Sequence, residues 1–350
     1  MKEWEKNIRR VVPYVPGEQP KLKNIIKLNT NENPYPPAPK VKDILQNMDT
    51  DELRLYPDPC AASLTSVIAK RYGLKESEVF VGVGSDDVLA MAFMTFFNSD
   101  KPIIFPDISY SFYSVWADLF RIPYVKAPLD ENLCLVKEDY LKENGGIIFP
   151  NPNAPTAIAV EPDFIEDIVA KNQDSVVIVD EAYIDFGGRS ALELTRKYDN
   201  LLVVQTFSKS RSMAGTRIGY AMGNEALIKA LSDVKFSFNS YTMNRAALAV
   251  GVAAVEDEDY FQDNLKKVIA TREWSKEKFV ELGFTVTDSK ANFLFVTHKN
   301  KAAKYIFETL KERGIFVRYF NIPRIDNYLR VTVGTDDEMK KMFSELKKIL

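Results

Sequence analysis

Short apolar runs alternate with amphipathic stretches along the chain from about residue 60 to residue 235. Strands are expected at 79–83, 103–105, 123–127, 146–149, 176–179, 201–205 and 217–222. Helices are expected at 61–72, 86–98, 111–121, 162–171 and 224–232. This alternation predicts an α/β domain in which a mostly parallel sheet lies between helices on both of its faces.

The pattern changes after about residue 240, where longer helical stretches come before shorter strands. Helices are expected near 242–256, 258–282 and 301–313 and from about 336 onwards, and strands at 284–287, 292–297, 315–318 and 328–334. This order predicts a smaller α+β domain. The first residues are too rich in proline for regular structure. We therefore expect an N-terminal arm (1–27), a large domain (28–238) and a small C-terminal domain (239–350).

Composition and charge narrow the class of protein. The 350 residues are 46% hydrophobic and 27% charged, with a formal net charge of −3, which argues against nucleic acid as the main partner. No apolar stretch approaches a membrane span, and the polar N-terminus lacks a signal-peptide core, so we expect no membrane partner. Cys60 and Cys134 form no metal or redox spacing, which favours the reducing cytoplasm. The single histidine, His298, rules out a multi-histidine metal site, and we expect no metal.

Two of the apolar runs are followed by residues that suit one cofactor. Asp180 and Tyr183 follow the run 176–179, and Lys209 follows the next run, with Arg217 eight residues later. Pyridoxal phosphate (PLP) needs a lysine amine for a Schiff base with its aldehyde and an acid that keeps its pyridine nitrogen protonated. The Tyr183 hydroxyl would hydrogen-bond the ring oxygen. A desolvated Lys209 beside this cationic cofactor would also serve as the general base.

Candidate phosphate ligands surround this lysine. Thr206 and Ser208 offer hydroxyl donors, and Arg217 offers a bidentate guanidinium. Further upstream, an apolar strand runs into a turn at Gly84, followed by Ser85 and Asp86 at the start of a helix. The N-terminus of a helix directs backbone N–H groups at an anion. Each feature alone is more simply an exposed loop lysine or a helix cap, and only their combination indicates a cofactor site.

On these residues the chain resembles the fold type I PLP-dependent aminotransferases, and within them the histidinol-phosphate aminotransferase family. The shared motifs are the Asp180–Tyr183 segment, Lys209 with Arg217, and Arg330 within 329–334. The narrower family is similar to this chain in three further segments, at 13–17, 28–34 and 54–58. Threonine-phosphate decarboxylases share much of that pattern, so they remain an alternative.

The resemblance implies roles for further residues. Tyr110 would stack on the pyridine face, and Arg330 and Arg318 would bind the substrate anions. Tyr14 and Asn31 would line the substrate pocket, and Tyr56 would contribute to substrate binding as well. The resemblance also implies a homodimer with a shared active site, because Tyr56 is similar to the tyrosine that reaches the cofactor phosphate of the neighbouring subunit.

One loop departs from the family pattern. Many relatives carry Asn-Pro-Thr-Gly where this chain has Ala154-Pro155-Thr156-Ala157. Alanine cannot donate the hydrogen bond that the asparagine makes to the ring oxygen, so Asn153 is expected to take that role from one position earlier, unless Tyr183 acts alone. Ala157 in place of glycine leaves the turn geometry open, since alanine disfavours positive φ.

The reaction that the resemblance implies is a transamination in two halves. Glutamate gives its amino group to the cofactor and leaves as 2-oxoglutarate, and imidazole-acetol phosphate then takes that group and leaves as histidinol phosphate. Aminotransferases for aromatic or dicarboxylic substrates are alternatives. A non-catalytic PLP-binding regulator is a more distant one, because such proteins usually carry a basic DNA-binding segment and none precedes residue 28.

Overall fold

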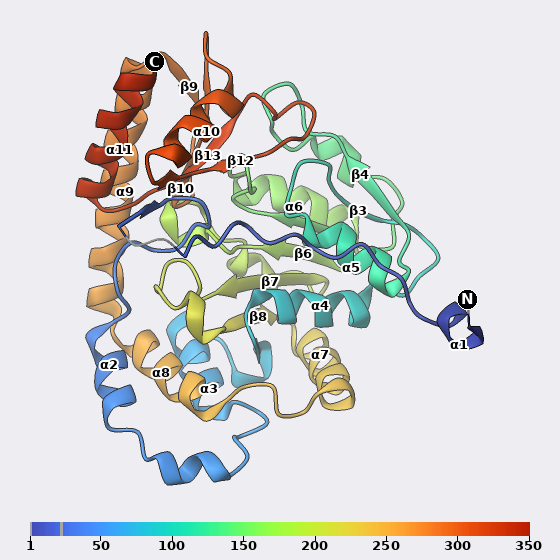
Figure 1. The fold of residues 1–350 in the computed structure, drawn as a ribbon. Helices are drawn as coiled ribbons and strands as arrows, with labels where there is room; N and C mark the ends of the chain where they lie inside the picture. The colour runs from blue at the N-terminus through green and yellow to red at the C-terminus, as the bar shows by residue number, and fades with distance from the viewer. Residues whose placement is uncertain (1, 22–23) are drawn as a thin grey trace.

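The computed structural model describes residues 2–21 and 24–350, and its centre is a seven-stranded sheet (Figure 1). The strand order is β2-β8-β7-β6-β5-β3-β4, and β8 alone runs antiparallel to its neighbours β2 and β7. The strands are β2 (Val79–Gly82), β3 (Ile103–Pro106), β4 (Tyr124–Ala127), β5 (Ile147–Pro150), β6 (Val177–Asp180), β7 (Leu201–Thr206) and β8 (Gly219–Gly223). The predicted mostly parallel sheet is confirmed.

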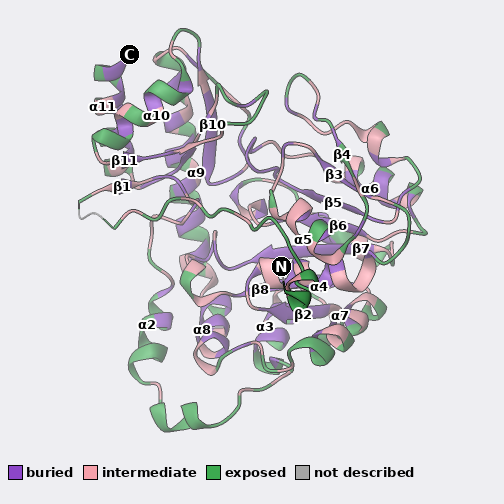
Figure 2. Cartoon of the chain, turned by 45° about the vertical axis from the view of Figure 1, so that its right-hand side comes forward, coloured by how far each residue is buried: buried purple, intermediate pink, exposed green. Residues whose placement is uncertain are grey.

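Helices cover both faces of this sheet because successive strand residues point to opposite sides. Val177 and Val179 of β6 belong to one apolar cluster, with α3 (Ala62–Tyr72), α6 (Pro162–Lys171) and α8 (Arg245–Glu256). Ile178 belongs to the other cluster. That second cluster contains α4 (Ser85–Phe96), α5 (Phe112–Phe120) and α7 (Glu225–Phe238). The sheet is therefore buried between two helical layers, as Figure 2 shows.

The C-terminal part has its own sheet and core. A four-stranded antiparallel sheet has the order β12-β13-β10-β9. Its elements are α9 (Glu258–Glu281), β9 (Phe284–Val286), β10 (Phe293–His298), α10 (Ala303–Glu312), β12 (Arg318–Tyr319), β13 (Leu329–Thr332) and α11 (Asp336–Ile349). The helix α11 starts with a capping box, because Thr335 and Glu338 each bond the other's backbone N–H. The α+β character expected for this part is confirmed.

Some elements differ from the sequence-based expectation. The arm contributes a short helix, α1 (Glu3–Lys6), and strand β1 (Ile26–Lys27), which pairs in parallel with β11 (Ile315–Phe316). Helix α2 (Pro39–Gln46) was not predicted. The short 3-10 helices are η1 (Thr50–Arg54), η2 (Glu76–Glu78), η3 (Lys137–Tyr140), η4 (Ile184–Phe186), η5 (Leu192–Arg196) and η6 (Ala214–Thr216). Helix α7 extends to Phe238, beyond the predicted residue 232.

The expected division into arm, large domain and small domain stays a prediction. Helix α8 lies after residue 238, the predicted end of the large domain, yet it packs on α2 and α3 beside the large sheet.

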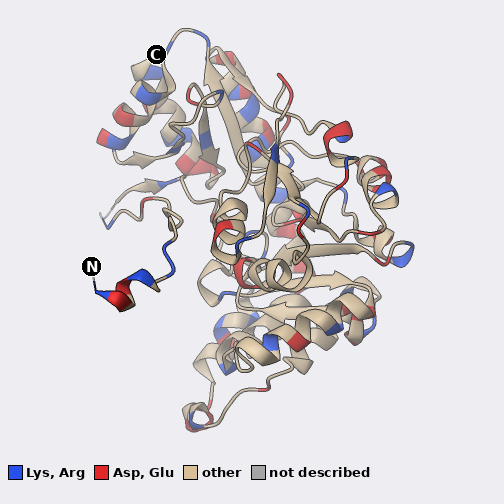
Figure 3. Ribbon diagram, turned by 90° about the vertical axis from the view of Figure 1, so that its right-hand side faces the viewer, with Lys and Arg blue, Asp and Glu red and all other residues tan. Residues whose placement is uncertain are grey.

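Positive and negative side chains are interspersed over the helices, strands and loops (Figure 3). Within the described residues, 2–21 and 24–350, no helix is long and apolar enough to cross a membrane.

A buried carboxyl group connects the ends of two central strands. Glu181, directly after β6, accepts hydrogen bonds from the Ala191 N–H (2.7 Å), the Ser190 hydroxyl (2.7 Å) and Gln205 Nε2 of β7 (2.8 Å). Gln205 in turn accepts from the hydroxyls of Tyr72 and Tyr220. Burial raises the pKa of Glu181 to about 7, although these three hydrogen bonds act in the opposite direction. The carboxyl group is therefore an acid whose ionisation opposes folding.

The pH dependence of stability tests this assignment. Because the folded-state pKa of about 7 lies above the usual 4.5, the unfolded chain ionises first as the pH rises, and stability falls through that interval. We expect the unfolding free energy of the wild type, relative to Glu181→Gln, to fall by about 2–3 kcal/mol between pH 5 and pH 8. Urea unfolding at both pH values measures it, with the exposed Glu131→Gln as control. A difference that stays constant with pH would contradict the assignment.

Candidate active site

The carboxyl ends of β5, β6 and β7 meet at one edge of the large sheet, and a cavity lies there. Residues from these ends, from α4 and from the loop after β7 line the cavity: Ser85, Asp86, Tyr110, Pro150, Ala154, Asp180, Ala182, Tyr183, Thr206, Ser208, Lys209 and Arg217. Apart from Asn153, Gly84 and Tyr56, the structure thus brings together the residues that the sequence predicts around a cofactor.

Asp180 is a buried carboxyl group that accepts two hydrogen bonds from residues that the structure describes. The Tyr113 hydroxyl lies 2.8 Å from its Oδ2, and the Ala182 N–H lies 3.2 Å from its Oδ1. Burial raises the pKa of Asp180 to about 6, while these two hydrogen bonds and the charge of Lys209 lower it. A positively charged group bound in the cavity would therefore stabilise the ionised form of this carboxyl group.

The loop after β7 holds Lys209 beside this carboxyl group. Lys209 Nζ lies 3.4 Å from the Thr30 carbonyl oxygen and 5.7 Å from the centre of the Tyr183 ring. Asn33 fixes the loop from the other side, because its Nδ2 donates to the carbonyl oxygens of Lys209 (3.1 Å) and Ser210 (3.2 Å). The lysine amine is thus placed over Tyr183.

An anion site lies at the other end of the cavity. Helix α4 begins after Gly84, and no side chain in the described part of the chain caps its first turn, so N–H groups of that turn are available to an anion. Gly84 has φ +83°, and a Cβ there would lie 2.5 Å from Arg217 Nη2. A Cβ at Gly219 would meet Ser85 N at 2.3 Å. These two glycines therefore allow β8 and Arg217 to approach the start of α4.

Asp86 holds two of its neighbours in place. Its Oδ1 accepts from the Tyr110 hydroxyl at 2.7 Å, and its Oδ2 accepts from Arg217 Nη2 at 3.2 Å. Arg217 Nη1 also contacts Ser208 Oγ at 3.4 Å, and Ser208 Oγ accepts from the Thr206 hydroxyl at 3.1 Å. Burial, with the nearby Asp86, raises the pKa of Tyr110, which keeps its phenol protonated. The carboxylate orients both the Tyr110 ring and the Arg217 guanidinium.

A second cavity adjoins the first and is lined by four of the five predicted substrate residues, Tyr14, Asn31, Arg318 and Arg330. The two cavities share Tyr110, Ala154, Tyr183 and Lys209. The other lining residues of the second are Tyr14, Gly17, Asn29, Thr30, Asn31, Ser109, Ser111, Pro155, Arg318, Phe320 and Arg330. The ring of Tyr14 stacks on Phe112, with centroids 4.2 Å apart.

Arg330 is a half-buried cation that lines this second cavity. Its Nη2 donates to the Asn29 carbonyl oxygen at 3.0 Å, and burial lowers its pKa. Its Nε has no hydrogen-bond partner among the residues that the structure describes. Arg318 lies on the neighbouring strand β12, paired with Arg330 of β13. Two guanidinium groups thus line one cavity beside Lys209.

The amide of Asn153, which was expected at the cofactor's ring oxygen, is hydrogen-bonded to other residues of the chain. Its Nδ2 donates to the Ile108 carbonyl oxygen (3.1 Å) and to Thr156 Oγ1 (3.0 Å), so both amide hydrogens are taken. It is not among the described residues that line either cavity, whereas Ala154 lines both. Ala157 adopts φ +65°, so the turn keeps a left-handed residue without glycine. With its amide bonded in this way, Asn153 leaves Tyr183 as the candidate donor to the cofactor's ring oxygen.

Tyr56 lies outside both cavities. Its side chain is 78% exposed, and its ring packs on Tyr241 with centroids 4.7 Å apart.

The sequence did not reveal two residues that hold the site together, Tyr113 beside Asp180 and Asn33 beside the Lys209 loop. Tyr113 lies inside an apolar helical stretch, where an aromatic residue looks like core packing, and only the fold brings it to Asp180.

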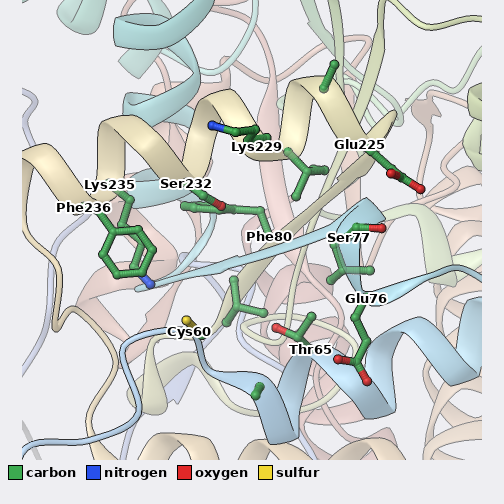
Figure 4. A pocket seen from close by; sticks show the side chains of 15 residues that line it. Cys60, Thr65, Glu76, Ser77, Phe80, Glu225, Lys229, Ser232, Lys235 and Phe236 are labelled. Atoms are coloured by element: carbon green, nitrogen blue, oxygen red, sulfur yellow. The ribbon is translucent and has the colours of Figure 1, made fainter.

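A larger groove of about 590 Å³ lies elsewhere, between α3, β2 and α7 (Figure 4). Phe80 and Phe236 line it, and Lys235 Nζ at its edge donates to the Pro59 carbonyl oxygen at 2.6 Å. None of the predicted catalytic, cofactor or substrate residues lines this groove. Groups of three or more metal-ligating side chains are absent from residues 2–21 and 24–350.

Known proteins resemble this chain over nearly its whole length. A protein of Clostridium beijerinckii named histidinol-phosphate aminotransferase is 50% identical, covering 100% of this chain and 98% of its own. One of Brachyspira hyodysenteriae with the same name is 52% identical, covering 98% and 97%.

Solved structures show the same fold at lower identity. The histidinol-phosphate aminotransferase of Sinorhizobium meliloti in complex with pyridoxal-5'-phosphate superposes with a TM-score of 0.86 at 22% identity. That match covers 93% of this chain and 90% of the other. Residues 23–346 match the family described as aminotransferase class I and II. This chain therefore belongs to the class I and II aminotransferases.

Proposed function

We propose that this chain is a PLP-dependent aminotransferase that exchanges an amino group between histidinol phosphate and 2-oxoglutarate, a step of histidine biosynthesis. The observation that carries the proposal is one continuous space with an acid, a lysine and an anion site at one end and two arginines at the other. The names of the relatives at about 50% identity agree with it.

The residues of the first cavity fit the cofactor. Asp180 provides an anion for the ring nitrogen, Lys209 an amine for the aldehyde, and Tyr110 an aromatic face. Backbone N–H groups at Ser85 and the side chains of Thr206, Ser208 and Arg217 provide donors for a phosphate. Gly84 leaves the space that a side chain would fill at this anion site. When bound, PLP supplies the electron sink that makes the α-proton of an amino acid acidic.

Three side chains then divide the proton chemistry. With PLP bound, Lys209 would move the proton between the substrate carbon and the cofactor, since its amine lines both cavities. Asp180 would keep the ring nitrogen protonated, because a cationic partner relieves the burial of its charge. Tyr183 would donate its hydroxyl hydrogen to the ring oxygen. The chain thus needs no histidine for these transfers.

The arginines explain how two different substrates use one site. Glutamate carries two carboxylates and histidinol phosphate one phosphate, and guanidinium groups bind either kind of anion through paired hydrogen bonds. Arg330, with its unpaired Nε among described residues, takes the anion nearest to Lys209. Arg318 takes the distal anion, and Tyr14 closes the cavity from the arm.

We also propose a homodimer with a shared active site. Tyr56 is exposed and lines neither cavity of its own chain. Large apolar side chains are also exposed in the segments 44–55 and 236–241: Ile44, Leu45, Leu53, Leu55, Phe236, Phe238 and Tyr241. Arg245, at the start of α8, holds Leu55 and Tyr56 against that helix, because its guanidinium donates hydrogen bonds to their carbonyl oxygens. The segment following α2 extends at the lower edge of the molecule, largely exposed (Figure 2). Grouped exposed apolar side chains are typical of protein interfaces.

We further propose that the enzyme works in the cytoplasm, where the free thiols of Cys60 and Cys134 stay reduced.

Addition of histidinol phosphate to the PLP-loaded protein, without any keto acid, tests the proposed reaction. We expect the yellow absorbance to disappear and one equivalent of imidazole-acetol phosphate to form, because Lys209 moves the substrate proton. Later addition of 2-oxoglutarate should restore the absorbance and yield glutamate. Lys209→Ala should show no turnover while its circular dichroism in the far ultraviolet is unchanged.

Other outcomes of this experiment would contradict the proposal. A yellow protein that reacts with phenylalanine or glutamate but not with histidinol phosphate would overturn the substrate. Release of carbon dioxide from phosphothreonine would identify a decarboxylase instead.

Replacement of Arg330 tests the anion site. We expect Arg330→Ala to lower kcat/KM about 30- to 100-fold for both glutamate and histidinol phosphate, since a charge-assisted hydrogen bond contributes about 2–3 kcal/mol. Arg330→Lys should recover only part of this loss, because an ammonium group cannot bind an anion through two parallel hydrogen bonds. Arg313→Ala, on the surface after α10, is the control. A loss confined to one of the two substrates would refute a shared anion site.

Mixed dimers test the shared active site. Lys209→Ala and Tyr56→Ala chains are each expected to be defective alone, and a heterodimer of the two regains one complete site. Random exchange of equal amounts of the two variants makes about half of the dimers heterodimers, each with one complete site. We therefore expect turnover after mixing to reach up to about half of one wild-type site per dimer, averaged over all dimers. Sedimentation of the wild type shows whether a dimer forms. If mixing restores nothing while dimers exchange, Tyr56 does not act across the interface.

A further inference from the structure

Asn31 makes hydrogen bonds with every polar group that it has. Its N–H donates to Thr332 Oγ1 and its Oδ1 accepts from the same hydroxyl, both at 3.0 Å. Its carbonyl oxygen accepts from Asn292 Nδ2 at 3.0 Å. Its Nδ2 donates to the Tyr183 hydroxyl oxygen, also at 3.0 Å. Asn31 is 1% exposed and has φ +58°, a conformation that asparagine tolerates better than most residues.

This arrangement decides which way the Tyr183 hydroxyl donates. Because Thr332 donates to Oδ1, the amide NH₂ group of Asn31 faces Tyr183, and the Tyr183 oxygen is the acceptor in that contact. The hydroxyl hydrogen of Tyr183 is then free for another acceptor. Tyr183 lines both cavities, and Phe293 packs edge-on against its ring at 5.1 Å. The free hydrogen is thus available on the cofactor side.

Asn31 also connects Tyr183 to the strand that carries the anion-binding arginine. Arg330 and Thr332 are two residues apart on β13, so their side chains point to the same face of the sheet. Arg330 holds the Asn29 carbonyl oxygen, and Thr332 holds Asn31. One face of β13 therefore fixes the segment 29–31 at two points, and Asn31 extends from that segment to Tyr183.

We infer that Asn31 is a positioning residue that directs the Tyr183 hydroxyl hydrogen at the cofactor's ring oxygen and couples its placement to β13. The inference rests on the proposed function, since it concerns the bound cofactor. It assigns Asn31 a task in addition to lining the substrate cavity. A hydroxyl that accepts a hydrogen bond is also a stronger donor, because linked hydrogen bonds polarise one another.

The expected signature is spectroscopic. The absorbance of a PLP protein changes with pH as the nitrogen that joins lysine to the cofactor loses its proton. A donor to the ring oxygen weakens the attraction between that oxygen and the protonated nitrogen, so the proton leaves at lower pH. Loss of the donor therefore raises the midpoint of the titration. Tyr183→Phe defines the full effect, an upward shift of about one pH unit for one charge-assisted hydrogen bond.

The test is a double-mutant cycle on this midpoint. Asn31→Gly removes the amide without backbone strain, and Asn31→Asp replaces the NH₂ group by an acceptor that draws the Tyr183 hydrogen away. We expect both to raise the midpoint, with Asn31→Asp close to the shift of Tyr183→Phe. In the double variant Asn31→Gly/Tyr183→Phe the shift should equal that of Tyr183→Phe alone.

The control is Asn144→Ala, which removes another buried asparagine that bonds Asn172 and the Gly146 N–H, away from both cavities. It should lower the melting temperature and leave the midpoint unchanged. Additive shifts in the double variant, or an unchanged midpoint in both Asn31 variants, would overturn the inference. A wild type that binds no PLP would instead overturn the proposed function, so the two failures are distinguishable.

Discussion

Burial of one negative charge organises this active site. Asp180 stands at the end of a strand that is covered on both faces, and desolvation opposes its ionisation. Within residues 2–21 and 24–350, only the Tyr113 hydroxyl and one backbone N–H donate to it, and Lys209 contributes a more distant positive charge. This is incomplete compensation for a buried carboxylate. A cationic ring nitrogen completes it, so the same burial that weakens Asp180 as an isolated anion strengthens its preference for a protonated cofactor.

The C-terminal sheet is connected to the active site through the segment that precedes the large sheet. Residues 28–33 run between Thr332 of β13 on one side and Tyr183 and the Lys209 loop on the other. Strand β1 adds a parallel pairing with β11, so the C-terminal part of the chain holds this segment through its backbone as well. The segment is therefore fixed by hydrogen bonds both to β13 and to residues that line the first cavity.

Much of this site was predictable because the fold type makes strand ends functional. Asp180 and Lys209 follow strongly apolar runs, and parallel strands bring such ends together, so sequence pattern alone located them. Tyr113 and Asn31 were different. Tyr113 sits in an amphipathic helix where a tyrosine is ordinarily core, and the hydrogen-bond direction of Asn31 depends on Thr332, 301 residues away. Asn153 was expected at the ring oxygen from its position in the sequence next to Ala154, but the sequence could not show that its amide donates to the Ile108 carbonyl oxygen. Helix α2 has eight residues and strand β1 has two, which is too short for a periodic pattern of apolar positions to identify them.

Asp86 shows why a charge that opposes ligand binding can still belong in a site. A carboxylate near a phosphate dianion is unfavourable by Coulomb repulsion, and Asp86 stands at the helix terminus where that phosphate would bind. Yet its two oxygens are occupied by Tyr110 and Arg217, whose ring and guanidinium the cofactor needs in fixed orientations. The guanidinium neutralises the carboxylate and retains further N–H donors for the phosphate. Pre-orientation lowers the entropy lost on binding, and that gain offsets the repulsion. The acidic residue in the anion site is therefore consistent with cofactor binding rather than an argument against it.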